Sequence, residues 1–252
     1  MRLDNYLVNI GLFDSRTKAK QAIERKEIFI NSKCIDKSSY LIDENLQYVV
    51  EKKALKQFVS LGGYKLDKAL DDFNYSVENH VVADIGASTG GFSDCLLQRG
   101  ASKVYCIDVN DYLLHDSLRK NKKVVSIIKN ARDLTIDDLP EKIDTIVADL
   151  SFISVTYVLK QLSDILTDGK SIIILIKPQF ETGTRKKYKN GIIRDTIIHK
   201  EICNNIIEFS KKCALSPVDF TVAPLNKDKN TEFLIRFIKG RTNFTTDFKL
   251  SF

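Results

Sequence analysis

The apolar residues of this chain are spaced in two different ways, before and after about residue 58. In the first part they recur at helical intervals over 3–10 and over 14–28, which predicts two short amphipathic helices. Two alternating stretches, 28–35 and 46–53, then predict short strands. Together these elements predict a small α+β domain over residues 1–58.

After residue 58, short apolar runs alternate with longer segments of helical periodicity. The predicted strands cover residues 81–85, 103–108, 124–128, 145–150, 171–177, 219–225 and 232–238. The predicted helices between them begin near Gly91 and cover 112–120, 154–167 and 195–214. This alternation predicts an α/β domain over 59–252, with a mostly parallel sheet and a terminal hairpin. Residues 51–64 join the two parts, and because 51–60 contains neither Pro nor Gly we expect an ordered link.

A lysine interrupts the most apolar run of the chain, "SIIILIKPQFE", residues 171–181. The isoleucine-rich part predicts a strand that is buried on both faces. Pro178 cannot continue a central strand, so Lys177 is expected at the strand's C-terminal end. Such a lysine is either a solvated charge or part of a site.

A glycine-rich turn, "GASTGG" at 86–91, follows the first of the later strands and precedes a helix. Its glycines let the backbone approach a ligand without a Cβ clash. Asp84 ends the first strand and Asp108 the second, where an acid can bind ribose hydroxyls. The turn lacks the G-x-G-x-x-G spacing of nicotinamide-binding proteins. An ordinary strand-to-helix turn is the alternative.

With Asp84 before it, this turn resembles the first motif of class I, Rossmann-like, seven-stranded S-adenosylmethionine-dependent methyltransferases. The resemblance implies that the cofactor is S-adenosylmethionine and that Asp84 orders its amino group. The implied cofactor-binding residues are Asp84, Gly86, Ser88, Thr89, Gly90, Gly91, Phe92 and Asp108. Asp133, after the third strand, is a candidate acceptor for the adenine amino group, and a plain helix-start acid is an equal alternative.

Four charged residues are expected at the sheet edge where ligands bind in such folds. They are Lys65, Asp149, Lys177 and Glu232, with Lys65 at the start of a helix that could fold over this edge. They resemble the Lys-Asp-Lys-Glu tetrad of FtsJ-like ribose 2′-O-methyltransferases. A lysine accepts a proton only in its neutral form, which burial and a second lysine favour.

We therefore predict that Lys177 is the base and Lys65 its electrostatic partner, and that the two acids orient the lysines. Solvated strand-end charges are the alternative for each residue. Methylation of a base would favour an Asn-Pro-Pro-Tyr type of strand end, whereas this chain has "DLSFIS" at 149–154.

The N-terminal part, with "RLDNYLV", "SRTKAKQAIE" and "IFINSK", resembles the RNA-binding module named after ribosomal protein S-four, the αL motif. The resemblance implies that Arg2, Ser15, Arg16 and Lys18 face RNA phosphates, which basic side chains neutralise with release of counterions. A solvated helix face is the alternative. The chain has Ser32 after Asn31 where the module usually has Gly.

The whole chain resembles the TlyA (hemolysin A) family through "VSLGGYKLDKAL", "ADIGASTGGFSDCLLQRGA", "VADLSFIS", "LIKPQFE", "NGIIRD" and "NTEFLI". This resemblance implies 2′-O-methylation of a cytidine in ribosomal RNA, mainly of the large subunit. The chain departs from the family at Leu61, where Arg is usual, and lacks the usual Gly before Asn230. A membrane-lytic hemolysin and a catalytically silent ribosome-assembly protein are the alternative functions.

Composition adds limits to this interpretation. The chain has 252 residues, 43% of them apolar and 29% charged, which is typical of a globular protein, and its net charge of +6 favours an anionic partner. The five cysteines form no CxxC pair and the three histidines are scattered, so we expect reduced thiols and no metal site. No signal peptide or membrane segment is recognisable, and we expect a cytoplasmic monomer.

Overall fold

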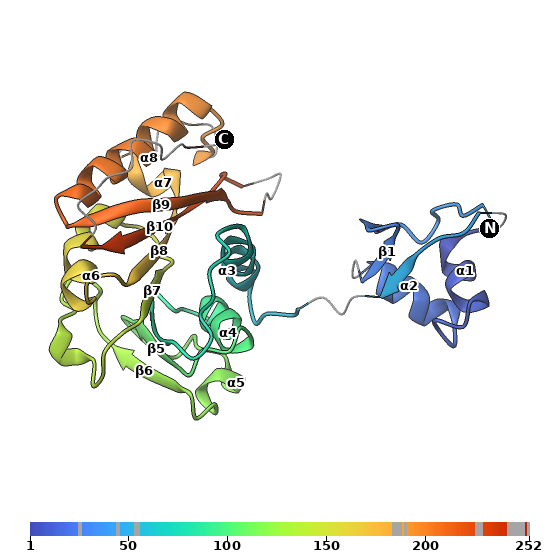
Figure 1. The fold of residues 1–252 in the computed structure, drawn as a ribbon, viewed down its shortest axis with the longest axis horizontal. Coiled ribbons are helices and arrows are strands. Elements are labelled where there is room, and N and C mark those ends of the chain that lie inside the picture. The colour runs from blue at the N-terminus through green and yellow to red at the C-terminus, as the bar shows by residue number, and fades with distance from the viewer. Residues whose placement is uncertain are drawn as a thin grey trace. The chain divides into compact units, whose positions relative to one another are not determined.

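The computed structural model describes residues 1–24, 27–43, 46–52, 56–182, 188, 191–224, 229–240 and 250. Contacts between Cα atoms divide the chain into two compact units, Met1–Gln57 and Phe58–Phe252 (Figure 1). Each unit has a hydrophobic core of its own. Among the described residues, no helix is both long enough and apolar enough to cross a lipid bilayer.

The N-terminal unit packs two helices against a small antiparallel sheet. Its elements are α1 (Leu3–Asn9), α2 (Arg16–Glu24), β1 (Ile28–Ile30), β2 (Lys33–Cys34) and β3 (Val50–Lys52), with the sheet order β2-β1-β3. Leu3 and Leu7 of α1 and Ile23 of α2 are fully buried, as their helical spacing predicts. Residues 25 and 26 of the longer predicted helix, and Lys53 of the predicted strand, lie outside the described residues.

A two-residue turn joins β1 to β2 although it lacks the usual glycine. Ile30 pairs with Lys33, and Asn31 and Ser32 between them have φ values of 47° and 65°. Two consecutive residues with positive φ are the mark of a type I′ hairpin turn. The Asn31 side chain also accepts a hydrogen bond from the Val49 amide at 2.9 Å, so it links this turn to the chain before β3.

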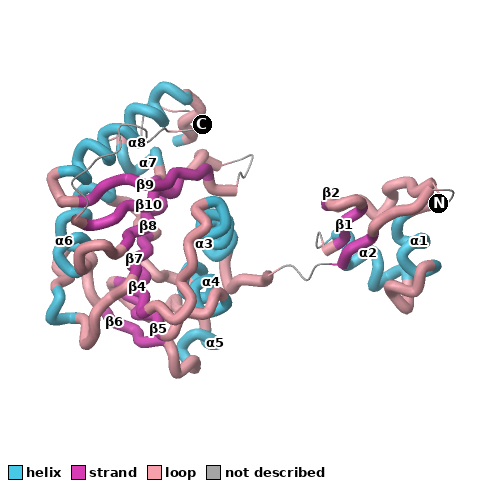
Figure 2. Tube along the Cα trace, viewed as in Figure 1, coloured by secondary structure: helices cyan, strands magenta, loops and turns pink. Residues whose placement is uncertain are grey.

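The second unit contains the predicted seven-stranded sheet (Figure 2). Its strands are β4 (Val81–Ile85), β5 (Lys103–Asp108), β6 (Val124–Ile128), β7 (Thr145–Ala148), β8 (Ser171–Ile176), β9 (Leu215–Val222) and β10 (Phe233–Lys239). The order is β6-β5-β4-β7-β8-β10-β9, and β10 runs antiparallel to both of its neighbours. The carboxyl ends of the five parallel strands and the start of β10 therefore meet at one edge.

Helices cover both faces of this sheet, which explains its apolar central strands. The helices are α3 (Leu61–Asp72), α4 (Gly91–Gln98), α5 (Asp116–Arg119), α6 (Leu159–Ile165), α7 (Pro178–Glu181) and α8 (Thr196–Lys211), with 3₁₀ turns η1 (Ile136–Asp138) and η2 (Val155–Tyr157). Ile172 and Ile174 of β8 pack into the core with α6 and α8, whereas Ile173 and Leu175 pack into the core with α3 and α4. Alternate side chains of one strand thus serve two cores.

Several element boundaries differ from the predictions. Helix α3 begins at Leu61, so Lys65 lies one turn inside it and does not begin it. The predicted helix 154–167 is a 3₁₀ turn followed by the shorter α6, and 112–120 contains only α5. Strand β9 begins at Leu215, before Pro217, because β9 is an edge strand, where proline is tolerated. Residues 225–228, including Leu225 of that predicted strand, lie outside the described residues.

Candidate functional site

A cavity of about 200 Å³ lies where β4 turns into α4. It is lined by Ser60, Gly62, Asp84, Gly86, Ala87, Ser88, Thr89, Gly91, Phe92, Asp149, Ser151 and Lys177. We call it the cofactor cradle. Six of the predicted cofactor-binding residues line it, whereas Gly90, Asp108 and Asp133 are not among the lining residues.

The glycines of the turn are needed for packing within the protein. Gly86 has φ +79°, and a Cβ there would lie 2.7 Å from the Asp149 carbonyl oxygen. At Gly90, with φ +87°, a Cβ would overlap the Leu118 side chain. A Cβ at Gly91 would overlap the Ser60 hydroxyl, so this glycine lets the start of α3 approach the start of α4.

Asp84 is completely buried beneath the cradle. Burial raises the pKa of its carboxyl group to about 7, against a hydrogen bond from Ser93, and the charges of Asp149 and Asp108 add to the rise. Its Oδ2 accepts from Ser93 Oγ at 2.6 Å, but its buried Oδ1 has no hydrogen-bond partner. A buried acceptor without a partner is costly, so this oxygen suits a cationic donor such as the amino group of the predicted cofactor.

Asp108 and Asp133 lie outside the cradle for different reasons. Asp108 ends β5, and its oxygens accept from the amides of Ser88 at 2.9 Å and Val109 at 2.7 Å. It therefore holds the glycine-rich turn in place, and its role toward ribose hydroxyls stays a prediction. Asp133 is exposed in the turn after β6, where its amide donates to the Asn130 carbonyl, and its role toward adenine stays a prediction.

The predicted tetrad forms two ion pairs. Lys177 Nζ lies 2.6 Å from Asp149 Oδ1, and the lysine side chain is only 11% exposed. Lys65 Nζ lies 2.5 Å from Glu232 Oε2, with both side chains mostly buried. Parallel pairing of β7 with β8 brings the first pair together, because Asp149 and Lys177 directly follow these strands.

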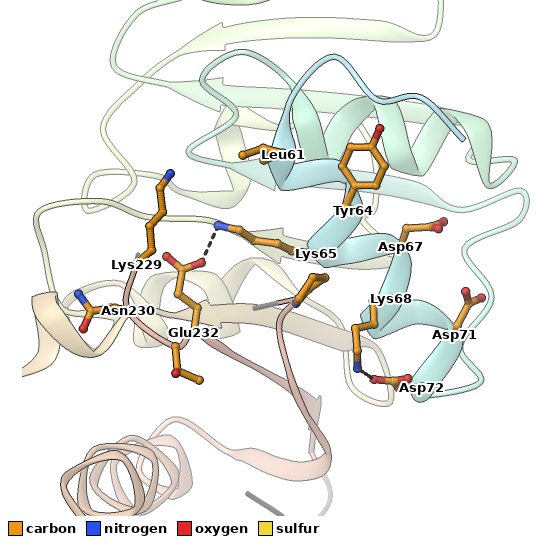
Figure 3. Close-up of a pocket in the computed structure, with 12 residues that line it drawn as sticks. Leu61, Tyr64, Lys65, Asp67, Lys68, Asp71, Asp72, Lys229, Asn230 and Glu232 are labelled. Atoms are coloured by element: carbon orange, nitrogen blue, oxygen red, sulfur yellow. Dashed lines mark hydrogen bonds and ion pairs between the residues drawn. The ribbon is translucent and has the colours of Figure 1, made fainter. Parts of the chain in front are cut away.

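The second ion pair lies at a larger cavity of about 1010 Å³ between α3 and the segment before β10. Figure 3 shows Lys65 reaching from α3 toward Glu232, with Lys229 beside them. The lining also includes Leu61, Tyr64 and Lys68. We call this cavity the α3 groove. The first turn of α3 contributes Gly62 to the cradle and Leu61 to the groove, so the two cavities are neighbours.

Two residues at this edge were missed in the sequence. Ser151 Oγ accepts a hydrogen bond from Lys177 Nζ at 2.8 Å and lines the cradle. Glu181 of α7 accepts from Ser154 Oγ at 2.5 Å and from the Val155 amide at 3.0 Å, which ties the segment after Lys177 to the loop after Asp149. Burial raises the pKa of the Glu181 carboxyl group. The sequence could have indicated Ser151 and Glu181, because they lie in "DLSFIS" and "LIKPQFE", the segments that contain Asp149 and Lys177.

The four predicted RNA-binding residues lie at the start of α1 and around the start of α2. Arg2 and Arg16 both contact the carboxylate of Asp4. Lys18 Nζ pairs with Asp14 Oδ2 at 2.8 Å, and the Lys18 amide donates to Ser15 Oγ at 3.4 Å. Arg2, Arg16 and Lys18 are 43%, 59% and 62% exposed, so each guanidinium or ammonium group can reach a ligand.

Comparison with known proteins identifies both units. The model of the FtsJ-like methyltransferase family matches residues 58–239, and the model of the S4 domain matches residues 1–47.

Hemolysin A of Brachyspira hyodysenteriae is 40% identical over 94% of this chain and all of its own length. The 23S rRNA (cytidine-2′-O)-methyltransferase TlyA of Campylobacter jejuni is 33% identical over 95% of this chain and all of its own length. A solved structure of a candidate hemolysin from Streptococcus thermophilus, 36% identical, covers 95% of this chain and 88% of its own, with a TM-score of 0.69. The chain therefore belongs to the FtsJ-like methyltransferase family, as a member with an N-terminal S4 domain like the proteins named TlyA and hemolysin A.

Proposed function

We propose that this protein is an S-adenosylmethionine-dependent methyltransferase that modifies the 2′-hydroxyl of a cytidine in ribosomal RNA. The Campylobacter jejuni relative, named for 23S rRNA, makes the large subunit the first substrate to test. The observation that carries the proposal is the Lys177–Asp149 ion pair on the wall of the cofactor cradle. It supports a role for Lys177 next to a cofactor bound in the cradle.

The reaction needs a base, because a ribose hydroxyl is a weak nucleophile. When bound, the cofactor supplies an electrophilic methyl group on a sulfonium. In its ion pair with Asp149, Lys177 is an ammonium group, so it must release a proton to solvent before its Nζ could accept the proton of the 2′-hydroxyl. The proton taken from the ribose would leave an ammonium group on Lys177, with its charge balanced by the Asp149 carboxylate.

The neighbours of Lys177 fix the position of its Nζ. Asp149 lies against Nζ on one side, and Ser151 Oγ accepts from it on another. All three residues line the cradle, so the free side of the amine is available to a ribose that enters there. Such positioning converts a random encounter into an aligned proton transfer.

Lys65 and Glu232 have a separate role in the α3 groove. Their ion pair balances the lysine charge while the groove is free of RNA. We assign the groove to the RNA segment next to the target ribose, where Lys65 stabilises the phosphates and raises the local positive potential at Lys177. Asp84, Ser88, Thr89 and Gly91 would hold the cofactor, with Asp84 Oδ1 on its amino group.

The decisive test replaces the proposed base. Lys177→Ala should reduce methyl transfer by about 10²- to 10⁴-fold, which is the usual contribution of a general base. Transfer is measured with radiolabelled cofactor and unmodified large-subunit ribosomal RNA, and cofactor binding by calorimetry should persist. Lys170→Ala is the matched control, because Lys170 pairs with Asp144 at the opposite end of β8. Full activity of Lys177→Ala would reject the mechanism.

The substrate nucleotide is tested in cells. Mass mapping of ribosomal RNA from strains with and without the gene should reveal one missing ribose methyl group on a cytidine of the large subunit. A missing methyl on a small-subunit cytidine would keep the activity and correct the subunit. An assay of erythrocyte lysis with the same purified protein examines the activity for which the Brachyspira relative is named.

A further inference from the structure

Asp4 is a buried acid at which two arginines meet. Only 2% of its side chain is exposed, although it lies in the first turn of α1. Arg2 donates to it through Nε to Oδ1 at 3.0 Å and through Nη2 to Oδ2 at 3.1 Å. Arg16, from the start of α2, donates through Nη2 to Oδ2 at 3.2 Å. The carboxylate therefore joins the starts of both helices.

This arrangement is specific to Asp4 among the acids of α1 and α2 that the structure describes. Its hydrogen bond with Arg2 lowers the pKa of the Asp4 carboxyl group against the effect of burial, and Arg16 adds to the lowering. Asp14, which comes just before α2, is in contrast 87% exposed and pairs with the exposed Lys18. An exposed pair of this kind holds its partners loosely, whereas a buried bidentate pair fixes a guanidinium plane.

The two arginines keep donors for a ligand. A guanidinium has five N–H donors in a rigid fork. Arg2 uses its Nε and one Nη2 donor on Asp4, and within the described part of the chain both Nη1 donors stay available. Arg16 uses a single Nη2 donor. Arg2 and Arg16 are 43% and 59% exposed, and two half-exposed guanidiniums on one carboxylate suit the oxygens of a nucleic acid backbone.

We propose that Asp4 is a positioning residue that holds Arg2 and Arg16 together as a phosphate clamp for the RNA backbone. Without the carboxylate, the two like charges repel and their long side chains lose a fixed geometry. With it, the pair carries a net charge of one and presents donors in one place. The proposal rests on the proposed function, since it takes ribosomal RNA as the ligand of the S4 domain.

The test asks whether removal of the negative charge of Asp4 strengthens or weakens RNA binding. Asp4→Asn removes a negative charge, so general electrostatics predicts tighter RNA binding, whereas the clamp predicts weaker binding. We expect Asp4→Asn to weaken binding of an unmodified large-subunit ribosomal RNA transcript about tenfold in the full-length protein. Asp14→Asn removes the same charge from an exposed acid and should bind as tightly as the parent or more tightly. Both are measured by fluorescence titration at several salt concentrations.

A second variant keeps the test possible if Asp4→Asn does not fold. Arg16→Lys keeps the charge and leaves the Arg2–Asp4 pair in place, but it loses the planar fork. It should weaken binding about threefold or more, with an unchanged melting temperature. If Asp4→Asn binds as tightly as Asp14→Asn, or if it unfolds and Arg16→Lys binds like the parent, the clamp is overturned. Methyl transfer by the parent protein would still support the proposed function in that case.

Discussion

At the scale of single residues, Asp84 links cofactor binding to pH. Its folded-state pKa of about 7 lies above the ordinary 3.8, so the acid is protonated below neutrality and must lose its proton to bind an ammonium group. Cofactor affinity should therefore rise about tenfold per pH unit from pH 5.5 toward 7 and then level off. Calorimetry across this range measures the effect.

Asp84→Asn is the control for that prediction. It should bind the cofactor weakly, and its affinity should not change over the same pH interval. Protein stability also depends on the protonation of Asp84. Between pH 3.8 and about pH 7, the folded protein keeps a proton on Asp84 that the unfolded chain has released. The contribution of Asp84 to the free energy of unfolding therefore falls as the pH rises. A parent affinity that is flat between pH 5.5 and 7 would contradict the raised pKa.

Ser151 is expected to act through Lys177. Removing its hydroxyl in Ser151→Ala should lower kcat about tenfold, the usual cost of losing a hydrogen bond to a charged group. The KM for RNA and the cofactor dissociation constant should change less than kcat, because the Ser151 hydroxyl bonds directly to Lys177 Nζ. Ser151→Thr keeps a hydroxyl and should recover most of the rate. A fall in kcat that Thr does not restore would point to a structural role instead.

At the scale of elements, the β1–β2 hairpin is strained at Ser32, where the chain departs from the usual Asn-Gly turn. Ser32 has a φ of 65°, a conformation that costs a side-chain-bearing residue about 1 kcal/mol relative to glycine. Ser32→Gly should therefore raise the free energy of unfolding of the N-terminal unit by about 0.5 to 1 kcal/mol. Asn31→Gly is the comparison variant. It also removes the 2.9 Å hydrogen bond from the Val49 amide, so it should raise the free energy of unfolding less than Ser32→Gly does. Denaturant unfolding of the parent and both variants measures these free energies.

Elements also show where sequence reasoning stops. The strands around Asp84, Asp149 and Lys177 follow from local apolar runs, and the structure has them. The start of α3 does not follow, because Gly62 and Gly63 are weak helix formers. A side chain at position 63 would overlap the Phe58 ring, so packing requires a glycine there although glycine is a weak helix former, and no local pattern reveals this contact. The early start of β9 likewise depends on its place at the sheet edge.

At the scale of the whole molecule, RNA affinity and chemistry should be separable. Arg16→Ala combined with Lys18→Ala should raise the KM for RNA. The slope of the logarithm of RNA affinity against the logarithm of salt concentration should become shallower by about 0.7 for each lost phosphate contact. Cofactor binding should stay as in the parent, because the two units have separate cores. Lys160→Ala, which removes an exposed lysine paired with Asp164 on α6, is the control. An unchanged salt slope in the double variant would reject these contacts.

The sequence by itself determined the order of the strands along the chain, the glycine-rich turn and the position of Lys177 at a strand end. These follow from local spacing, because apolar periodicity and turn residues act over a few positions. The tertiary structure alone decided which charges meet: Lys177 with Asp149 and Ser151, Lys65 with Glu232, and two arginines on Asp4. These partners come from different elements, so their pairing depends on how strands and helices pack, which no local pattern contains.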